Sequence, residues 1–429
     1  MKNLLFIGDL RTANNYGAIA TTETLVKLIE NEHYDANIKF IDYRSLYRPT
    51  PVDGFPVMSL KRRLSIKKYV ASHLPRKVKN GIKRILRCFF DLEKPVEDFV
   101  PYKYSQYEEY YEQMQTGARL QFEKKMLEWA DIVYINGEGN IVNGTDKYGK
   151  YRMGARYILF MAWVSKVKYK YPTLIVNHTV DPNNYNAFEI IEHVYPQLDK
   201  IYVRETLSLS LLYQHGIQNS TFVPDALWAY QPVSNWQPSD ALKKEIDFSK
   251  PYLCIGDSSG IRNAYGKVKW DVCQVLGEII DRLQEIVPQV IFVDGYSSGN
   301  EEINKLVDKK HIGRVNLSNC SYHDLYHVLK GATLFISGRW HASILSTLAN
   351  TPILLWGADS HKTKSLYTLL DYKYRFFEVS TLPVNIDELV ETAQQIIHNA
   401  AIVKTDMAKY SKKYAEESIE NAKVLKNYV

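Results

Sequence analysis

Cysteine is scarce in this chain of 429 residues, which has four, at positions 88, 254, 273 and 320. No two of them form a C-x-x-C pair, and their spacing suggests neither a disulfide framework nor a zinc site. We therefore expect a protein of a reducing compartment, the cytoplasm, without structural disulfides.

Long apolar runs are absent as well. The chain has no uninterrupted apolar stretch of about 18 residues, so we expect no membrane-spanning helix. The apolar run near the N-terminus, Leu4 to Ile7, is too short for a signal peptide and predicts a first β-strand instead.

Motifs for common cofactors and metals are missing too. The polar loop from Gly8 to Gly17 follows the first strand but lacks the G-x-G-x-x-G pattern of dinucleotide-binding folds. No D-x-D pair lies in a suitable loop, and no His/Cys/Asp cluster has the spacing of metal ligands. We expect no metal and no cofactor.

One segment of the chain is strongly basic. Residues 61–90 hold eleven lysines and arginines and no acid, although the net charge of the whole chain is only +6. A basic helix with an apolar stripe could lie on an anionic membrane surface, or it could be a packed helix with a solvated face. Nucleic acid is not an expected partner, because no nucleic-acid-binding module accompanies the charge.

Strand-like and helical segments alternate along most of the chain, which predicts parallel, doubly wound sheets. Residues 45–125 break this rhythm, first with prolines and the basic segment and then with the tyrosine-rich stretch YKYSQYEEYYEQ; we interpret them as an insertion or a lid. Residues 231–250 carry little periodicity and separate two groups of βα units.

The expected fold is therefore α/β, with two Rossmann-like domains facing a cleft in a GT-B-like architecture. We expect an acceptor-side domain over residues 1–235, including the insertion, and a donor-binding domain over residues 250–402. A long helix over residues 403–429 should close the chain and pack back toward the first domain.

The segment SGRWHAS is the strongest candidate for a binding site. Ser337 and Gly338 end a predicted strand, and Arg339 and His341 open the helix that follows. A helix N-terminus with nearby cations favours anions, although an ordinary turn is the alternative. Lys362, at the head of the next predicted helix, could reach the same anion.

Polar residues also follow several other strand-like runs, where ligands of parallel sheets bind. Glycines flank Glu138 in the sequence NGEGN, which exposes its carboxylate and lets the backbone approach a ligand. The remaining candidates at strand ends are Asp9, Asn140, His178, Arg204, Asp257 and Ser258. Asp225, after Pro224, is interpreted as a turn residue or a helix cap.

The order of these motifs resembles the polysaccharide pyruvyltransferase family. The segments that carry the resemblance are NNYG (Asn14, Asn15, Tyr16 and Gly17), INGEGN, YVRETLS, VPDALW and SGRWHAS. The resemblance implies transfer of the enolpyruvyl group of phosphoenolpyruvate onto two sugar hydroxyls, giving a cyclic ketal. It also implies a donor site at Arg339 and His341, with Arg204 as the second cation.

In this interpretation His341 is the catalytic acid and Glu138 the base or hydroxyl anchor, with Asp9 and Asp257 behind it. The acceptor is a glycan or a lipid-linked saccharide of surface polysaccharide synthesis, such as capsule, O-antigen or exopolysaccharide. Two alternatives stay open: a metal-independent glycosyltransferase that uses an activated sugar, and a non-catalytic glycan-binding protein. We expect a cytoplasmic protein, peripheral on the inner face of the cell membrane if residues 61–90 bind lipid.

Overall fold

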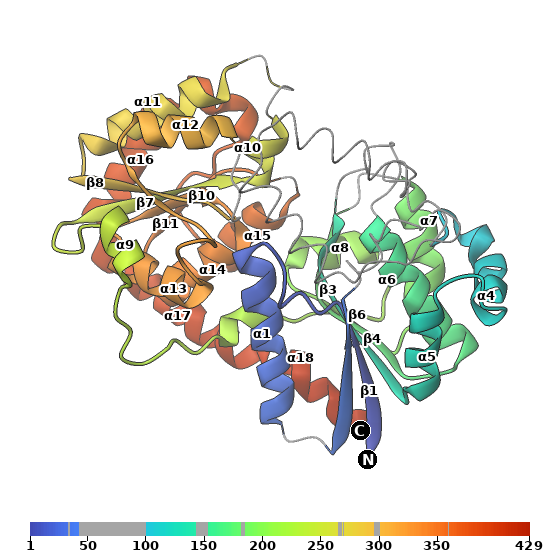
Figure 1. The fold of residues 1–429 in the computed structure, drawn as a ribbon. Helices are drawn as coiled ribbons and strands as arrows, with labels where there is room; N and C mark the ends of the chain where they lie inside the picture. The colour runs from blue at the N-terminus through green and yellow to red at the C-terminus, as the bar shows by residue number, and fades with distance from the viewer. Residues whose placement is uncertain are drawn as a thin grey trace, which may run out of the picture.

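The computed structural model describes residues 1–32, 35–42, 100–142, 153–181, 185–264, 268, 270–295, 301–358 and 360–429. In this part of the chain, two lobes are each built on a parallel β-sheet covered by helices (Figure 1). The predicted α/β fold of two Rossmann-like lobes is confirmed.

The first lobe carries a six-stranded sheet in the order β2-β1-β3-β4-β5-β6. Its strands are β1 (Lys2–Ile7), β2 (Ala36–Ile41), β3 (Ile132–Val142), β4 (Thr173–Asp181), β5 (Lys200–Val203) and β6 (Ser220–Phe222). The helices along this part of the chain are α1 (Tyr16–Asn31), α4 (Tyr107–Gln115), α5 (Gln121–Trp129), α6 (Met153–Trp163), α7 (Tyr185–Val194) and α8 (Thr206–Gln214). A short 3-10 helix, η5 (Ala226–Ala229), follows the last strand.

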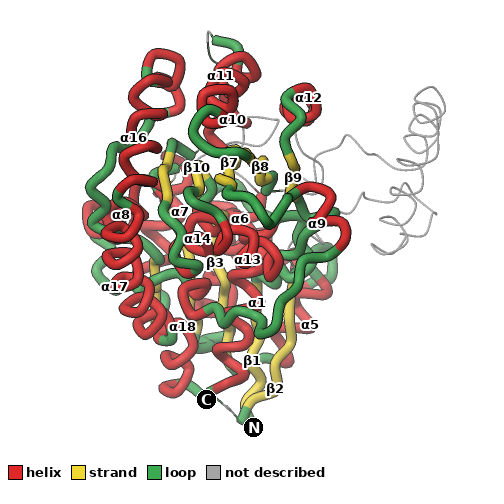
Figure 2. Tube along the Cα trace, turned by 90° about the vertical axis from the view of Figure 1, so that its left-hand side faces the viewer, coloured by secondary structure: helices red, strands yellow, loops and turns green. Residues whose placement is uncertain are grey.

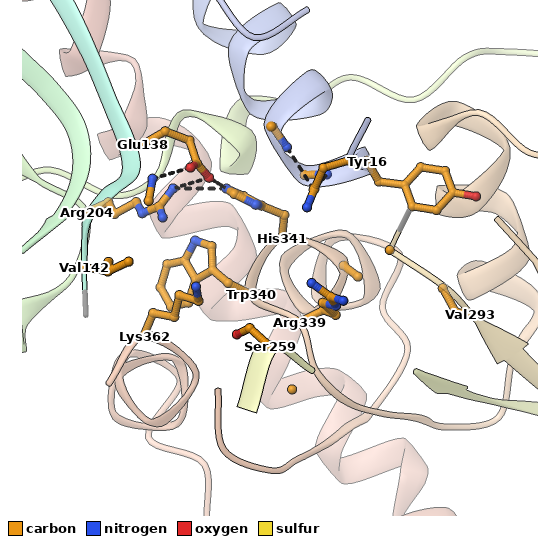
Figure 3. Close-up of a pocket in the computed structure, with 17 residues that line it drawn as sticks. Tyr16, Glu138, Val142, Arg204, Ser259, Val293, Arg339, Trp340, His341 and Lys362 are labelled. Atoms are coloured by element: carbon orange, nitrogen blue, oxygen red, sulfur yellow. Dashed lines mark hydrogen bonds and ion pairs between the residues drawn. The ribbon is translucent and has the colours of Figure 1, made fainter. Parts of the chain in front are cut away.

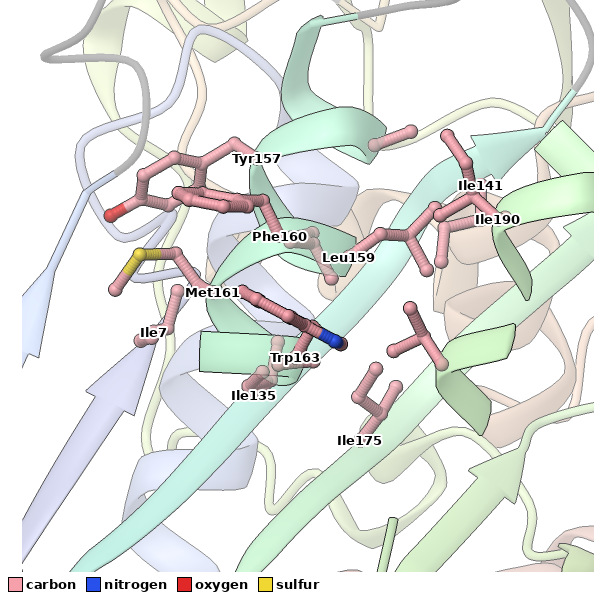
Figure 4. Close-up of a cluster of buried hydrophobic side chains, with 14 of the residues drawn as sticks. Ile7, Ile135, Ile141, Tyr157, Leu159, Phe160, Met161, Trp163, Ile175 and Ile190 are labelled. Atoms are coloured by element: carbon pink, nitrogen blue, oxygen red, sulfur yellow. The ribbon is translucent and has the colours of Figure 1, made fainter. Parts of the chain in front are cut away.

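The side chains of β1 show why this sheet is buried on both faces. Leu5 and Ile7 belong to the apolar cluster that includes α6, whereas Leu4 and Phe6 belong to the cluster on the opposite face. Successive side chains of a strand point to opposite faces, so the continuous apolar run fits a central parallel strand. Figure 4 shows Ile7, Ile135 and Ile175 of three neighbouring strands beneath Met161 and Trp163 of α6.

The tyrosine-rich stretch that suggested a lid packs into the core of the first lobe. Tyr107 meets Phe160 of α6 edge-on with ring centroids 5.2 Å apart, and Tyr110 meets the same ring at 6.4 Å. Both tyrosines are buried, and their helix lies on the outer side of α6 (Figure 1). The expectation of a lid is therefore wrong for residues 100–115, because their apolar rings are taken up by α6.

The basic segment, residues 61–90, lies outside the described residues. Among the helices that are described, none combines the length and the apolarity needed to cross a lipid bilayer.

The second lobe carries a five-stranded sheet in the order β11-β10-β7-β8-β9. Its strands are β7 (Tyr252–Ser258), β8 (Gln289–Val293), β9 (Gly313–Val315), β10 (Phe335–Gly338) and β11 (Ile353–Leu355). The helices along this part are α9 (Asp240–Glu245), α10 (Ser259–Ala264), α11 (Val272–Gln284), α12 (Glu301–Lys309), α13 (Tyr322–Gly331), α14 (Trp340–Leu348), α15 (Lys362–Leu369) and α16 (Ile386–His398).

The chain ends on the first lobe. The predicted long helix over residues 403–429 is broken, since α17 (Ala400–Ser418) stops before α18 (Glu420–Lys423) and a final 3-10 turn. Ala422 and Leu425 pack against Leu4 and Phe6. The hydroxyl of Tyr134 donates to the carbonyl of Asn421 at 2.6 Å, which anchors the returning chain to β3.

Helix α1 joins the two lobes. Tyr16 and Ala20, on α1, belong to the same buried cluster as Trp340 and Leu345 of α14. Figures 1 and 2 show α13 and α14 below the strands of the second sheet, with α1 beginning near them and running down alongside the first sheet. The two lobes therefore share an apolar interface, and a polar pocket opens at the edge of it.

Phe160→Ala should destabilise the protein by about 3–5 kcal/mol, because it removes a fully buried ring and leaves a cavity beneath Tyr107 and Tyr110. Urea unfolding measures the change. Phe122→Ala, which truncates a ring that is 50% exposed on α5, is the matched control and should change stability by less than about 0.5 kcal/mol. Equal effects of the two substitutions would contradict the packing described for α6.

Candidate active site

The pocket between the two lobes has a cavity volume of about 180 Å³. Both lobes contribute to its lining, which consists of Asn15, Tyr16, Gly17, Ala18, Glu138, Gly139, Val142, Arg204, Ser259, Val293, Gly295, Gly338, Arg339, Trp340, His341, Ala342 and Lys362. Figure 3 shows Glu138, Arg204 and His341 turned toward one another, with Arg339 and Ser259 in another part of the pocket.

Three helices begin at the pocket. The first turn of α1 follows Asn15, whose side chain accepts hydrogen bonds from the backbone N–H groups of Gly17 and Ala18. Helix α14 begins with Trp340 and α15 with Lys362, and no side chain caps the N-terminus of either. The positive ends of three helix dipoles therefore favour an anion in this pocket.

A buried ionic cluster forms the floor of the pocket. Arg204 Nη1 lies 2.8 Å from Asp225 Oδ2 and 3.6 Å from Glu138 Oε1. His341, from the other lobe, places Nε2 3.3 Å from Asp225 Oδ2 and 3.5 Å from Glu138 Oε1. The cluster brings two cation-forming side chains and two carboxylates together across the lobe boundary.

Nε2 of His341 has partners for both of its protonation states. Arg204 Nη1 lies 3.1 Å away and can donate only to a nitrogen that carries no proton. The carboxylates of Asp225 and Glu138 can accept only from a nitrogen that does. This arrangement suits a histidine that gains and loses a proton during a reaction.

Both carboxylates of the cluster stay ionised. Burial alone would raise the pKa of Asp225, but the charges of Arg204 and His341 and a hydrogen bond from Trp340 Nε1 lower it far below its usual value. Burial also opposes ionisation of Glu138, yet Arg204, His341 and the backbone N–H of Gly139 lower its pKa overall. The negative charges thus balance the cations of the cluster.

Local backbone geometry brings Glu138 to this place. Strand β3 runs through the whole NGEGN segment, which the sequence was interpreted to place after the end of a strand. Its pairing with β4 shifts register between Glu138 and Ile141, and Glu138 has a φ of 43°. A positive φ is costly for a residue with a side chain and is found where a function or a tight fit requires it.

The imidazole of His341 lies so close to α1 that the NNYG motif must end in a glycine, Gly17. A Cβ atom placed on Gly17 would lie 2.6 Å from Cγ and 2.8 Å from Cβ of His341. Since real side chains do not approach so closely, only glycine allows α1 to pack directly on the imidazole. The close approach fixes the ring against the carboxylates.

Arg339 lines the pocket but is already paired. Its Nε and Nη2 atoms donate to the two oxygens of Asp257 at 2.7 and 3.0 Å. The buried Asp257 carboxylate thus occupies the Nε–Nη2 side of Arg339, and the contact of Arg339 with a donor anion stays a prediction. Asp257 therefore orients Arg339, and the prediction that it stands behind Glu138 as a base does not fit this pairing.

Several predicted site residues lie outside the pocket lining, each with its own structural role. Asp9 is bound by Arg11 through two contacts of 2.9 and 3.0 Å. The hydroxyl of Ser258 accepts from the backbone of Ile261, and that of Ser337 donates to the carbonyl of Asp257. Asn140 donates to the carbonyl of Gly137. Asn14 does not line the pocket either.

His178 is also a structural residue. It lies within β4, fully buried, with Nδ1 2.9 Å from the carbonyl of Tyr202 and Nε2 3.1 Å from the hydroxyl of Tyr195. Burial lowers its pKa to about 3, so the ring is neutral. The earlier placement of His178 in the cleft is therefore corrected.

Asp225 is the residue that the sequence interpretation undervalued. It does cap η5, as expected, since Oδ1 accepts from the backbone N–H of Leu227 at 2.9 Å. The same oxygen accepts from Thr21 of α1 at 2.7 Å, while Oδ2 serves Arg204, Trp340 and His341. The only signal in the sequence was a carboxylate directly after a strand, in VPDALW.

Within the described residues, no three histidine, cysteine, aspartate or glutamate side chains are arranged to hold a metal ion.

A model of the polysaccharide pyruvyl transferase family matches residues 15–355. The amylovoran biosynthesis protein AmsJ of Erwinia amylovora is 22% identical over 268 residues, which are 57% of this chain and 60% of that protein. The chain thus spans less than two thirds of the length of this curated relative.

Solved structures resemble the whole chain at low identity. MnaA of S. aureus with UDP has a TM-score of 0.55 at 12% identity, covering 100% of this chain and 98% of that one. Sucrose-phosphate synthase from Thermosynechococcus elongatus has a TM-score of 0.53 at 12% identity, covering 100% and 97%. Likeness at this level concerns the two-lobed fold alone.

Asp225→Asn should lower the free energy of unfolding by about 3–5 kcal/mol at pH 7, because it breaks a buried ion pair. Folding lowers the pKa of this carboxyl. Its contribution is therefore complete above the pKa of an unfolded aspartate, about 3.9, and is lost as the pH falls below that value.

Urea unfolding of both proteins from pH 8 to pH 3 measures this effect. The gap between wild type and variant should stay constant down to about pH 5 and shrink below about pH 4. Asp240→Asn, at an exposed position on α9, is the control and should have almost no effect. A gap that is unchanged at pH 3, or absent at pH 7, would contradict the role of Asp225.

Proposed function

The chain belongs to the polysaccharide pyruvyl transferase family, and from this premise we propose that it transfers the pyruvyl group of phosphoenolpyruvate onto hydroxyls of a sugar. The product is a ketal-linked pyruvate, and inorganic phosphate leaves. The acceptor in this proposal is a surface glycan or its lipid-linked precursor.

The observation that carries the proposal is that one pocket combines a small volume with the positive ends of three helix dipoles. The pocket volume of about 180 Å³ is below the ~300–1,000 Å³ that is typical of sites for drug-sized ligands. A nucleotide sugar belongs to that larger class of ligands. Phosphoenolpyruvate has three carbons and two anionic groups. Three helix N-termini together with Arg204 and Lys362 supply what those groups need.

The residues can be given steps in which protons and bonds balance. An imidazolium at His341 delivers a proton to the methylene carbon, which makes the neighbouring carbon electrophilic. A first sugar hydroxyl adds to that carbon and gives up its proton. A second hydroxyl then replaces the phosphate, which takes up that hydroxyl's proton as it leaves and whose charge is stabilised by Arg204, Lys362 and the helix N-termini. The proton that Glu138 took from the first hydroxyl returns to His341, which restores both residues.

Glu138 is the acceptor for the hydroxyl proton in this scheme. Its charge is held by Arg204 and His341. A donor anion competes for the same two cations. Glu138 then loses its stabilising partners, which raises its basicity at the step where a base is needed.

Further parts of the proposal follow from the sequence rather than from the pocket. The chemistry requires neither a metal nor an organic cofactor, and we propose none. Contact of residues 61–90 with an anionic membrane surface, and a cytoplasmic location, are also proposals. Binding to vesicles with and without anionic lipid, at low and high salt, would examine the membrane contact.

Calorimetric titration of the purified chain with phosphoenolpyruvate, a UDP-sugar and a CMP-sugar tests the donor. We expect phosphoenolpyruvate to bind and to stabilise the fold, by about 2.7 kcal/mol at one hundred times its dissociation constant. Binding of a nucleotide sugar with none of phosphoenolpyruvate would favour glycosyl transfer instead. Binding of a glycan alone, without either donor, would favour the non-catalytic alternative.

Gly17→Ala should lower turnover by about 100-fold or more without unfolding the protein, since the added methyl displaces the imidazole of His341 and general acid catalysis contributes about that much. Phosphate release from phosphoenolpyruvate in the presence of acceptor measures it. Gly277→Ala, in α11 and remote from the pocket, is the control. Full activity of Gly17→Ala would show that the position of this ring does not matter.

A further inference from the structure

A second ionic cluster crosses the lobe boundary beside the pocket. His361, the residue before α15, places Nδ1 3.4 Å from Asp181 Oδ2 and Nε2 3.2 Å from Glu205 Oε2. Its backbone N–H also donates to Asp181 Oδ2 at 2.8 Å. Asp181 ends β4 and Glu205 precedes α8, so His361 of the second lobe is held by two carboxylates of the first.

Ser208 completes the cluster from the first lobe. Its hydroxyl can donate to Glu205 Oε1 at 2.5 Å or to the carbonyl of Val180 at 2.9 Å, accepts from the backbone N–H of Val180 at 2.7 Å, and lies 3.2 Å from Nε2 of His361. Each ring nitrogen of His361 faces a carboxylate oxygen, Oδ2 of Asp181 or Oε2 of Glu205, and a carboxylate can only accept. Both ring nitrogens of His361 therefore act as donors, as in an imidazolium.

The charge of His361 follows from the groups that face it. Burial opposes the charge, but the hydrogen bonds and charges of Asp181 and Glu205 outweigh burial and raise the pKa of His361 to about 9. Among the described residues, the charged neighbours are Asp181 from β4, Glu205 before α8 and Lys362, the next residue in the chain. The ring is thus a cation at neutral pH.

The cluster resembles a serine–histidine–aspartate triad in its order of contacts, but it cannot act as one. Ser208 is fully buried, so no substrate can reach its oxygen. A protonated His361 cannot accept the hydroxyl proton of Ser208, as the base of a triad must. The arrangement is suited to holding parts together rather than to nucleophilic attack.

The cluster around His361 holds a part of the pocket in which we place the donor. Arg204 and Glu205 are adjacent: the first reaches His341 of α14, and the second reaches His361 before α15. Lys362, which lines the pocket, directly follows His361 and opens α15. One dipeptide of the first lobe therefore contacts the starts of both helices that the second lobe points at the pocket.

We propose that Glu205, Asp181 and Ser208 are positioning residues that act through His361 to hold Lys362 and the N-terminus of α15 against the anionic donor. This inference rests on the proposed function for the identity of the donor. Its structural half, the immobilisation of α15, does not depend on any donor. Removing the charge of His361 should loosen α15 and weaken donor binding while the chemistry at His341 stays intact.

The test compares wild type with His361→Gln, which keeps a backbone N–H for Asp181 and loses the charge. Amide hydrogen exchange at pH 7.5 should be about ten-fold faster in residues 362–369 of the variant and unchanged in α11. Phosphoenolpyruvate should bind about ten-fold more weakly, with KM raised and kcat nearly unchanged. The control is His215→Gln, which removes a histidine from another His–Glu pair, 2.7 Å from Glu192 on the first lobe.

The pH dependence of phosphoenolpyruvate affinity separates the charge of His361 from its packing, because packing alone would not change with pH in this range. The affinity of the wild type for phosphoenolpyruvate should fall as the pH rises through about 9, and His361→Gln should show this fall to a smaller extent. Glu205→Gln keeps an acceptor for Ser208 and should show the same changes in amide exchange and affinity as His361→Gln. It replaces His361→Gln in the test if that variant does not fold.

Each outcome decides one claim. Unchanged exchange in α15 with unchanged affinity would overturn the positioning role. Faster exchange in α15 of the variant, with no binding of phosphoenolpyruvate by any form of the protein, would support the immobilisation of α15 by His361 and overturn the proposed donor. A fall in kcat without a change in KM would show that the cluster acts on chemistry rather than on position.

Discussion

The carboxylate of Asp225 is the constraint on which the rest of the site depends. It is completely buried, yet it carries a charge, so it must be surrounded by donors from whatever elements reach it. Those donors come from α1, from the end of β5 and from the first turn of α14, which means from both lobes. Satisfying one buried charge thus sets the distance between Arg204 and His341 and places Glu138 opposite them.

Helix termini and glycines complete the pocket around this charge. Because α1, α14 and α15 begin at the same place, the positive ends of their dipoles converge on a small volume, and Gly17 lets α1 approach closely enough for that to happen. The ionic contacts of Arg204 and Glu205 reach α14 and α15 separately. The two-lobed fold thereby acquires a pocket with buried cations and positive helix ends, which suits the small anionic donor that we propose.

The sequence predicted the fold and the main parts of the site, because both follow from local patterns. Apolar runs alternating with helical periodicity indicated two parallel sheets, and a cation beside a helix start indicated Arg339, His341 and Lys362. It did not reveal that Asp257, far upstream, takes the bidentate face of Arg339, or that His178 is buried beneath Tyr195. Partners that are distant in the chain are set by tertiary packing, and no spacing in a single sequence encodes them. The prediction of a lid from the tyrosine-rich stretch was wrong for the same reason, since the burial of this stretch depends on its contact with α6.

The most direct test of this account is a crystal structure of the protein grown or soaked with phosphoenolpyruvate. The account predicts the ligand in the pocket between the lobes, with its anionic groups bound by Arg204, Lys362 and the N-terminus of α14, and with its methylene carbon within reach of His341. Glu138 should have moved away from Arg204. A ligand bound elsewhere, or one that contacts neither Arg204 nor His341, would contradict the central claim.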